Sequence, residues 1–365
     1  MSLNDLPDIC LWKIFKNVNE AEDLIRLSKV CSRWSDLITL RFRRVKYLQK
    51  MEIYSREVKA DYIDTNSLWI NRNTNWSYYN LLQFFPNFKI IDTATYSYNS
   101  SLNLPEIVKN NPQIKGLIGY FNSLIKREDY DLSNIEMFAS EFNFDYKKVF
   151  RPDQLKQVFG SFINKIDLPS FIEYFPNLKR LHMQFYRKDQ VFYNGPNLSA
   201  LKILEFGRID MVGKFTGFHF IDFCPSLESA FIGYWAEDIY VKESIKNYNL
   251  RDLVIENIRF GCFLWLPLKK LVSKFPNLQH LAIRKFDKLD VSHFDLEELI
   301  QLIPKLKILD LRGCKKVTHK SADFLSKYCA KKNRSIVIYY DCENETHRWP
   351  KLVNTINELA MDLIS

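Results

Sequence analysis

The sequence has little glycine and no long apolar run. Glycine occurs ten times in 365 residues, less than half of the usual frequency of about 7%. Because phosphate-binding loops need glycines at fixed spacing, this scarcity argues against a P-loop or Rossmann nucleotide frame. The longest apolar stretch, near residues 262–268, is far shorter than the ~18 residues that a membrane span needs. No membrane partner is therefore expected.

Cysteine pairs and signal-peptide features are also missing. The seven cysteines are scattered and never form a C-x-x-C pair, which argues against a disulfide framework or a structural zinc site. The first eight residues are polar and acidic, with no basic segment followed by an apolar one, so no secretory signal is expected. We predict no metal and no other cofactor, and a location in the cytoplasm, the nucleus or both.

The charge balance is only mildly positive. Fifty-two Lys and Arg residues against 43 Asp and Glu give a net charge of +9, spread over a long chain, so no nucleic-acid partner is expected. No G-x-S-x-G, H-E-x-x-H, Walker or kinase motif occurs. We therefore assign no catalytic residue and expect a protein that is not an enzyme.

What the sequence does contain is a distinct N-terminal segment of about fifty residues. Asp5 precedes Leu6-Pro7, a helix-start signal, and apolar residues then recur at helical spacing in three short stretches, the third starting near Ser32. The basic stretch 41–50 is expected to continue the third helix as a solvated face; the alternative is a nucleic-acid or nuclear-import patch. So small a unit has difficulty burying its apolar residues, which favours a covering partner.

Two motifs in this segment resemble an F-box. They are L-P-D-I-C-L-W-K-I-F at residues 6–15 and D-L-I-R-L-S-K-V-C-S-R-W at residues 23–34; Ile9 stands where the family usually has Glu. The resemblance implies docking to a Skp-type adaptor and, through it, to a cullin-RING ubiquitin ligase. The residues that it marks as adaptor-binding are Leu6, Pro7, Ile14, Phe15, Leu24, Leu27, Val30, Cys31 and Trp34. Alternatively, these residues form the core of a three-helix cap on the next domain.

After residue 50 the chain becomes self-similar. Six segments share the form (P-N)-L-x-x-L-x-apolar, and their first leucines, at 178, 201, 227, 250, 278 and 306, lie 23 to 28 residues apart. Weaker copies are expected at residues 86–91, 112–117, 134–138 and 163–168. Each L-x-x-L-x-L lays down a short strand that cannot bury its face alone, whereas stacked units share a core. The spacing predicts a leucine-rich-repeat solenoid with about ten or eleven repeats.

The segment after Leu306 resembles the cysteine-containing leucine-rich repeat, a subtype frequently paired with an F-box. It reads L-x-x-L-x-L-x-G-C-x-x-V-T from Leu306, with a second cysteine at Cys329. Together the two resemblances identify an F-box/leucine-rich-repeat family member. They imply an α+β chain: a three-helix F-box at residues 1–49, a curved solenoid at 50–345 with parallel strands on its concave face and helices on its convex face, and a capping helix at 346–365. A membrane-surface role for that last helix is the alternative.

A protein substrate is expected on the concave face of the solenoid. By the repeat register, the residues flanking the inward leucines line that face; the predicted substrate-binding residues are Arg180, His182, Ile203, Glu205, Phe231, Val254, Glu256, Arg284, Asp310 and Arg312. An apolar centre with a charged rim suits a protein partner. The predicted function is substrate recognition for a ubiquitin ligase; the alternative is a scaffold or adaptor outside any ligase.

Overall fold

A computed structural model describes most of the chain. The described residues are 3–51, 66–71, 81–93, 104–119, 132–141, 144–162, 168–185, 192–206, 214–234, 238–257, 262–286, 288–290, 293–314 and 316–340. The chain divides into two compact units, whose described parts fall within residues 3–155 and 156–340. In these ranges no helix has both the length and the apolar character that crossing a membrane requires.

The first unit begins with three helices, as the sequence predicts. A short 3-10 turn, Leu3–Asp5, precedes α1 (Asp8–Lys16), α2 (Ala21–Ser28) and α3 (Ser32–Arg43). Each helix buries one apolar stripe, which gives a small shared core. The residues that fill it are Leu11, Phe15, Ala21, Leu24, Trp34, Ile38 and Phe42.

A sheet of parallel strands follows, in the spatial order β2-β1-β3-β4-β5. The strands are β1 (Tyr47–Met51), β2 (Ser67–Asn71), β3 (Ile90–Asp92), β4 (Gly116–Ile118) and β5 (Met137–Glu141). Short helices precede or follow them: α4 (Leu81–Phe84), α5 (Leu104–Asn110) and α6 (Tyr146–Val149). The strands β3, β4 and β5 lie where the weaker sequence copies predict strands. The expected domain boundary at residues 49/50 falls inside β1.

The third helix is shorter than the sequence predicts. Of the predicted stretch 41–50, only residues 41–43 continue the helix, because α3 ends at Arg43 and the chain turns into β1. The amide nitrogen of Lys46 donates to the carbonyl oxygen of Asn66 at 2.8 Å, and the Tyr47 side chain is buried. This prediction was wrong because tertiary pairing with a neighbouring strand outweighed the local helical pattern.

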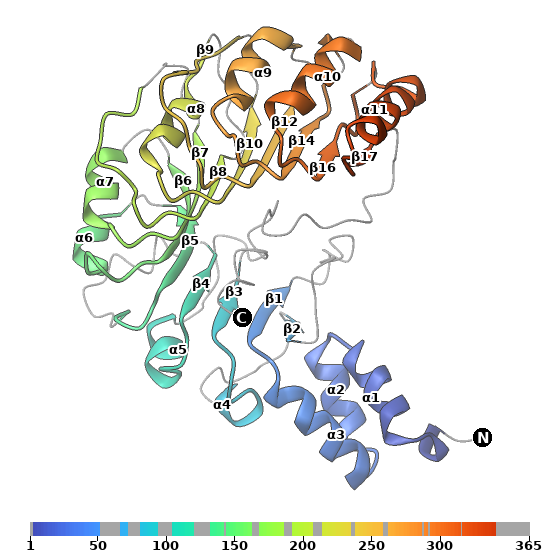
Figure 1. Cartoon of the computed structure of the whole chain (residues 1–365). Coiled ribbons are helices and arrows are strands. Elements are labelled where there is room, and N and C mark those ends of the chain that lie inside the picture. Colours follow the sequence, from blue (N-terminus) through green and yellow to red (C-terminus); the bar gives the residue numbers. More distant parts are fainter. Residues whose placement is uncertain are drawn as a thin grey trace. The chain divides into compact units, whose positions relative to one another are not determined.

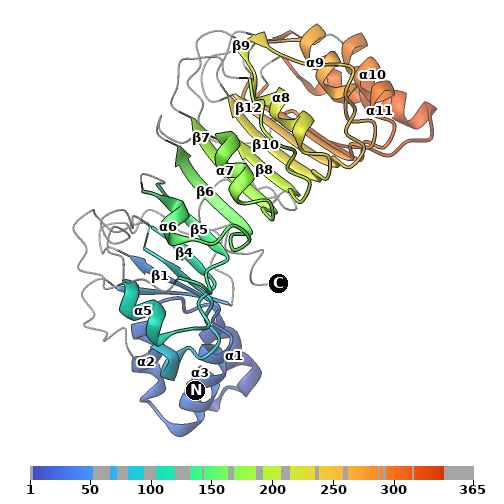
Figure 2. The same cartoon turned by 90° about the vertical axis from the view of Figure 1, so that its left-hand side faces the viewer.

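The second unit is a longer parallel sheet, in the order β6-β7-β8-β10-β12-β14-β16-β17 (Figures 1 and 2). Its strands are β6 (Gln157–Phe162), β7 (Arg180–Phe185), β8 (Ile203–Phe206), β10 (Ser229–Tyr234), β12 (Asp252–Asn257), β14 (His280–Arg284), β16 (Ile308–Asp310) and β17 (Val337–Tyr339). Two further parallel pairs join β9 (Lys214–Phe215) to β11 (Asp238–Ile239) and β13 (Cys262–Leu264) to β15 (Lys288–Asp290).

Helices connect the strands of the second unit and cover one side of its sheet (Figure 1). They are α7 (Leu168–Tyr174), α8 (Gly217–Phe220) with a 3-10 turn at Ile221–Phe223, α9 (Trp265–Val272), α10 (His293–Leu302) and α11 (His319–Lys331). Apolar residues recur at helical spacing at residues 168–175 and 296–303, the segments that contain most of α7 and α10. A parallel sheet needs such crossovers, because a hairpin cannot connect parallel strands.

A backbone ladder aligns the strands at their N-terminal ends. The residue that directly precedes a strand donates its amide N–H to the carbonyl oxygen of the residue that directly precedes the neighbouring strand, at 2.7–2.9 Å. Examples are the bonds from Lys179 to Lys156, from Lys202 to Lys179 and from Arg251 to Glu228. The apolar residue immediately before each of these positions is buried, as Leu178, Leu201 and Leu250 show. The L-x-x-L spacing thus sets the register of the strands.

One predicted copy is displaced. Most of the segment 163–168 lies outside the described residues, and the strand in this part of the chain is β6. Its buried apolar entry is Leu155, which lies 23 residues before Leu178. The spacing from this entry to the next therefore falls within the 23 to 28 residues that separate the six clear copies.

The cysteine-containing turn after β16 is tightly packed. Gly313 has φ +74°, a left-handed conformation that favours glycine, and a Cβ at this position would lie 3.2 Å from the backbone of Lys285. Cys314 is buried and its thiol donates to the carbonyl of Ile283 at 3.1 Å. Cys314 is thus a packed, hydrogen-bonded turn residue. The predicted capping helix at residues 346–365 lies outside the described residues.

Candidate functional site

Large apolar side chains are exposed on the three N-terminal helices. Ile9 and Ile14 on α1 are 66% and 42% exposed, and Val30, just after α2, is 54% exposed. Leu3 and Leu40 are also exposed. Exposed apolar side chains on so small a unit favour contact with a partner.

The residues predicted from the sequence to bind an adaptor divide by burial. Pro7, Ile14 and Val30 are exposed; Leu6, Leu27 and Cys31 are partly buried; Phe15, Leu24 and Trp34 are buried. The ring centroids of Phe15 and Trp34 lie 5.1 Å apart in an edge-to-face arrangement. Phe15, Leu24 and Trp34 therefore belong to the core of the three helices, and only the exposed and partly buried residues are accessible to a partner.

Arg33 holds the N-terminal segment against α3. Its Nε donates to Asp8 Oδ1 at 2.6 Å, and its two Nη atoms donate to the carbonyls of Asn4 and Leu6 at 2.7 and 2.6 Å. This fork fixes the start of α1 beside the end of the V-C-S-R-W motif. The sequence pattern predicts no role for Arg33 in this contact, although the residue lies within the V-C-S-R-W motif.

In the second unit, several predicted substrate-binding residues pair with one another. Arg180 Nη2 on β7 lies 3.1 Å from Glu205 Oε1 on β8, and His182 Nδ1 lies 3.5 Å from the other carboxylate oxygen. All three side chains are buried. Burial alone would raise the pKa of Glu205, but the charge of Arg180 and the hydrogen bond of His182 outweigh it and lower that pKa.

A second group joins β14 to β16. Arg284 Nε donates to Asp310 Oδ2 at 2.9 Å, and Arg312 Nη2 donates to the same oxygen at 2.7 Å. Burial opposes the ionised carboxylate, but the hydrogen bond of Arg312 and the charge of Arg284 lower the pKa of Asp310. In both groups, ion pairs between side chains link neighbouring strands.

The remaining predicted residues differ in accessibility. Ile203 and Val254 are buried, whereas Phe231 and Glu256 are partly exposed. Glu256 forms an ion pair with Lys285, a residue outside the predicted set. Among the predicted substrate-binding residues, the clearly accessible ones are therefore Phe231, Glu256 and Arg312, which is also partly exposed.

A third polar group links β10, β12 and β14. Ser229 Oγ donates to Asp252 Oδ2 at 2.7 Å, and His280 Nδ1 contacts the other oxygen of that carboxylate. A serine, a histidine and an aspartate are present, but Asp252 lies between the other two. The histidine therefore does not contact the serine hydroxyl as a general base would.

Three of the described thiols are buried, whereas those of Cys10 and Cys31 are partly exposed. Cys224, Cys314 and Cys329 are buried free cysteines, and burial raises the pKa of Cys224 and of Cys329. Within the described ranges, no three His, Cys, Asp or Glu side chains are close enough to share a metal ion.

Comparison with known proteins assigns the helical part. Residues 3–45 match the model of the F-box-like family. The three helices α1, α2 and α3 lie within that span. A search of curated proteins found no significant match. The N-terminal helices thus form an F-box-like domain, and a sheet of parallel strands with helices follows it.

Proposed function

We propose that this chain is a substrate-recognition subunit of a Skp–cullin–F-box ubiquitin ligase. The observation that carries the proposal is the exposed apolar surface of the F-box-like domain, formed by Ile9, Ile14 and Val30. Domains of this kind generally bind a Skp-type adaptor. Ile9, which departs from the family's usual Glu, is the most exposed of the three and adds apolar area to this surface.

Adaptor binding is tested with the full chain. The double variant Ile14→Glu/Val30→Glu places two carboxylates in the proposed interface, and we expect its affinity for a purified Skp-type adaptor to fall at least about tenfold, since each charge must be desolvated on binding. Leu266→Glu is the matched control, because Leu266 is 62% exposed but lies on α9 in the second unit. Unchanged affinity in the double variant would refute this interface.

We further propose that the second unit is a leucine-rich-repeat domain that binds a protein substrate. Support comes from the L-x-x-L register, the backbone ladder and the one-sided placement of the helices. Since Arg180, Glu205 and Asp310 are buried and paired, recognition depends on the accessible residues Phe231, Glu256 and Arg312. An apolar side chain near charged ones suits a protein surface.

Substrate binding is tested by proximity labelling in cells with the full chain. Proteins that are retained by Ile14→Glu/Val30→Glu but lost by Phe231→Asp are the substrate candidates. The cullin and the adaptor should show the opposite pattern. If Phe231→Asp retains every partner, the proposed face does not bind a substrate; if the wild-type chain labels no cullin, the ligase proposal fails.

A further inference from the structure

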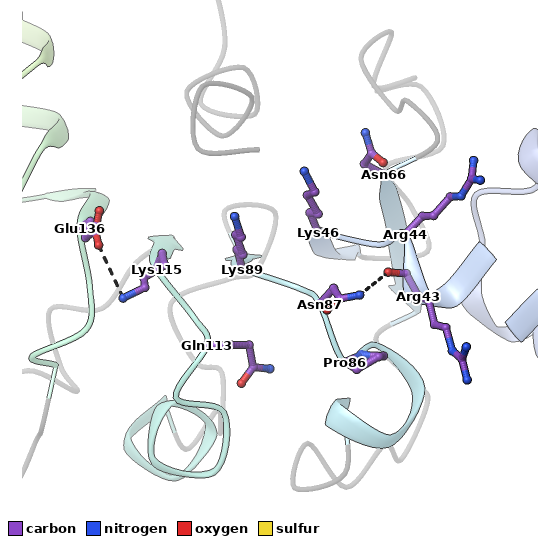
Figure 3. Close-up of a pocket in the computed structure, with 10 residues that line it drawn as sticks. All are labelled: Arg43, Arg44, Lys46, Asn66, Pro86, Asn87, Lys89, Gln113, Lys115 and Glu136. Carbon is purple, nitrogen blue, oxygen red and sulfur yellow. Dashed lines mark hydrogen bonds and ion pairs between the residues drawn. The ribbon is translucent and has the colours of Figure 1, made fainter. Parts of the chain in front are cut away.

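The first unit contains a basic pocket on the side where its strands begin. Its volume is about 680 Å³. The lining residues are Arg43, Arg44, Lys46, Asn66, Pro86, Asn87, Lys89, Gln113, Lys115 and Glu136 (Figure 3). Five of these ten side chains are cationic and one is acidic, so the lining has a charge of +4. Such a concentration of charge lowers the cost of holding an anion.

The lysines form a row across three neighbouring strands. Lys46, Lys89 and Lys115 directly precede β1, β3 and β4, and their backbones are joined by two hydrogen bonds of 2.7 Å, from the Lys89 amide to the Lys46 carbonyl and from the Lys115 amide to the Lys89 carbonyl. Because strands lie about 4.8 Å apart, the row spans about 10 Å. Lys46 and Lys89 extend side by side in the same direction, and Lys115 reaches toward Glu136 (Figure 3), at 3.5 Å.

The end of α3 supplies the arginines. The guanidinium of Arg44 lies 4.8 Å from the centroid of the Trp12 ring, and Asn87 Nδ2 donates to the carbonyl of Arg43 at 2.7 Å. These contacts join the helix end to the loop before β3. Cations are common at helix C-termini because they offset the helix dipole, but that explanation does not extend to the lysine row, which lies on strands.

Gln113 also lines the pocket. Its side-chain nitrogen is buried and has no hydrogen-bond partner among the described residues. Because this nitrogen is shielded from solvent, it does not itself face a ligand, and the case for an anion rests on the cations of the lining.

The second unit offers an internal comparison. Lys179 and Lys202 precede β7 and β8 just as Lys89 and Lys115 precede β3 and β4, and Lys202 pairs with Glu228 at 2.9 Å much as Lys115 pairs with Glu136. The third lysine of this second row is Lys156, which precedes β6 as Lys46 precedes β1. It follows Asp153-Gln154-Leu155, whereas Lys46 follows Arg43-Arg44-Val45. The two arginines therefore distinguish the pocket from a repeated surface row.

We propose that this pocket binds a soluble anion that carries two or more phosphate groups. A row about 10 Å long with cations on successive strands suits several linked phosphates better than one, and the two guanidinium groups add donors that match phosphate oxygens. The proposal does not depend on the proposed ligase role, because the exposed apolar residues Ile9, Ile14 and Val30 are not among the lining residues.

The test measures binding of inorganic triphosphate to the full chain by calorimetry at physiological salt. We expect Lys89→Gln/Lys115→Gln to bind triphosphate at least about tenfold more weakly than the wild type, as two charge-assisted contacts are lost. Lys179→Gln/Lys202→Gln removes the same charge from the equivalent positions in the second unit and should bind like the wild type. A second variant, Arg43→Gln/Arg44→Gln, should also weaken binding if the first is poorly folded.

Three results would overturn the proposal. Equal weakening in both lysine variants would show general attraction to a basic protein. Equal affinity for inorganic phosphate and triphosphate would remove the requirement for linked phosphates. Binding of a doubly phosphorylated peptide without binding of triphosphate would show that the pocket takes a modified protein segment instead of a soluble anion.

Discussion

At the scale of single residues, the buried ion pairs of the second unit are the most consequential feature. Arg180 and Glu205 are almost fully buried and 3.1 Å apart, so each neutralises a charge that would otherwise be costly in the interior. Arg180 and Glu205, which the sequence predicts to bind a substrate, thus pair with each other and stabilise the fold. The sequence shows the charges but not their pairing, because the partners lie 25 residues apart and meet only when strands align.

Glu205→Gln is expected to destabilise the chain by about 3–5 kcal/mol, because Arg180 keeps a buried charge without a counter-ion. Lys202→Gln is the control: it breaks the half-exposed Lys202–Glu228 pair of 2.9 Å and should cost less than about 1 kcal/mol. Urea unfolding followed by circular dichroism gives both values. Equal losses in the two variants would contradict the distinction drawn from burial.

The same pair predicts a pH dependence. The pKa of Glu205 is lower in the folded chain than its ordinary value, so the folded state binds fewer protons and the pair stabilises it fully above the ordinary pKa of about 4.3. That contribution is lost as the pH falls toward and through the lowered folded pKa. The difference in Tm between wild type and Glu205→Gln should therefore shrink from pH 7 to pH 3. A constant difference would refute the assignment.

At the scale of elements, the asparagine of the P-N-L segments links successive turns. Asn249 Nδ2 donates to the carbonyl of Pro225 and Asn277 Nδ2 to that of Tyr248, both at 2.8 Å. Asn87 makes the equivalent bond to Arg43 at 2.7 Å. Arg43, Pro225 and Tyr248 each lie three residues before a residue whose backbone joins neighbouring strands. The end of α3 therefore occupies the position that a turn occupies in the second unit. The F-box-like helices thus merge into the first strand without a linker.

Asn277→Ala is expected to lower the free energy of unfolding by about 0.5–1.5 kcal/mol, the net value of one hydrogen bond. Asn177→Ala is the matched control, since Asn177 occupies the same position in Pro176-Asn177-Leu178 and has no described side-chain bond. Thermal and urea unfolding of the two variants compare the positions directly. A loss of similar size at Asn177 would show that the effect belongs to the turn conformation and not to the bond.

At the scale of the whole molecule, the chain consists of two compact units, each with its own buried core. Ile114 and Phe138 are fully buried in the first, and Leu253 and Leu281 in the second. Units with separate cores can unfold at different temperatures, so two-state unfolding of the whole chain is not expected.

Calorimetry of the full chain should therefore show two transitions. Ile114→Ala, which opens a cavity costing about 2–5 kcal/mol, should lower the transition of the first unit only, whereas Glu205→Gln should lower only that of the second. A single transition that both variants shift alike would show that the two units unfold together.

Local patterns in the sequence determined much of this protein. The motifs at residues 6–15 and 23–34 predicted the helices of the F-box-like domain, because helical spacing and caps are local properties. The L-x-x-L spacing located most strands of the second unit, since it sets which side chains enter the core.

Tertiary structure alone decided what depends on neighbours distant in the chain. It ended α3 at Arg43, where strand pairing outweighed helical pattern, and it paired Arg180 with Glu205 across adjacent strands. It also gathered Arg43, Lys89 and Lys115 into one pocket, although 72 residues separate the first from the last. Sequence spacing predicts which residues face inward, but charges find partners only through the register of the assembled sheet.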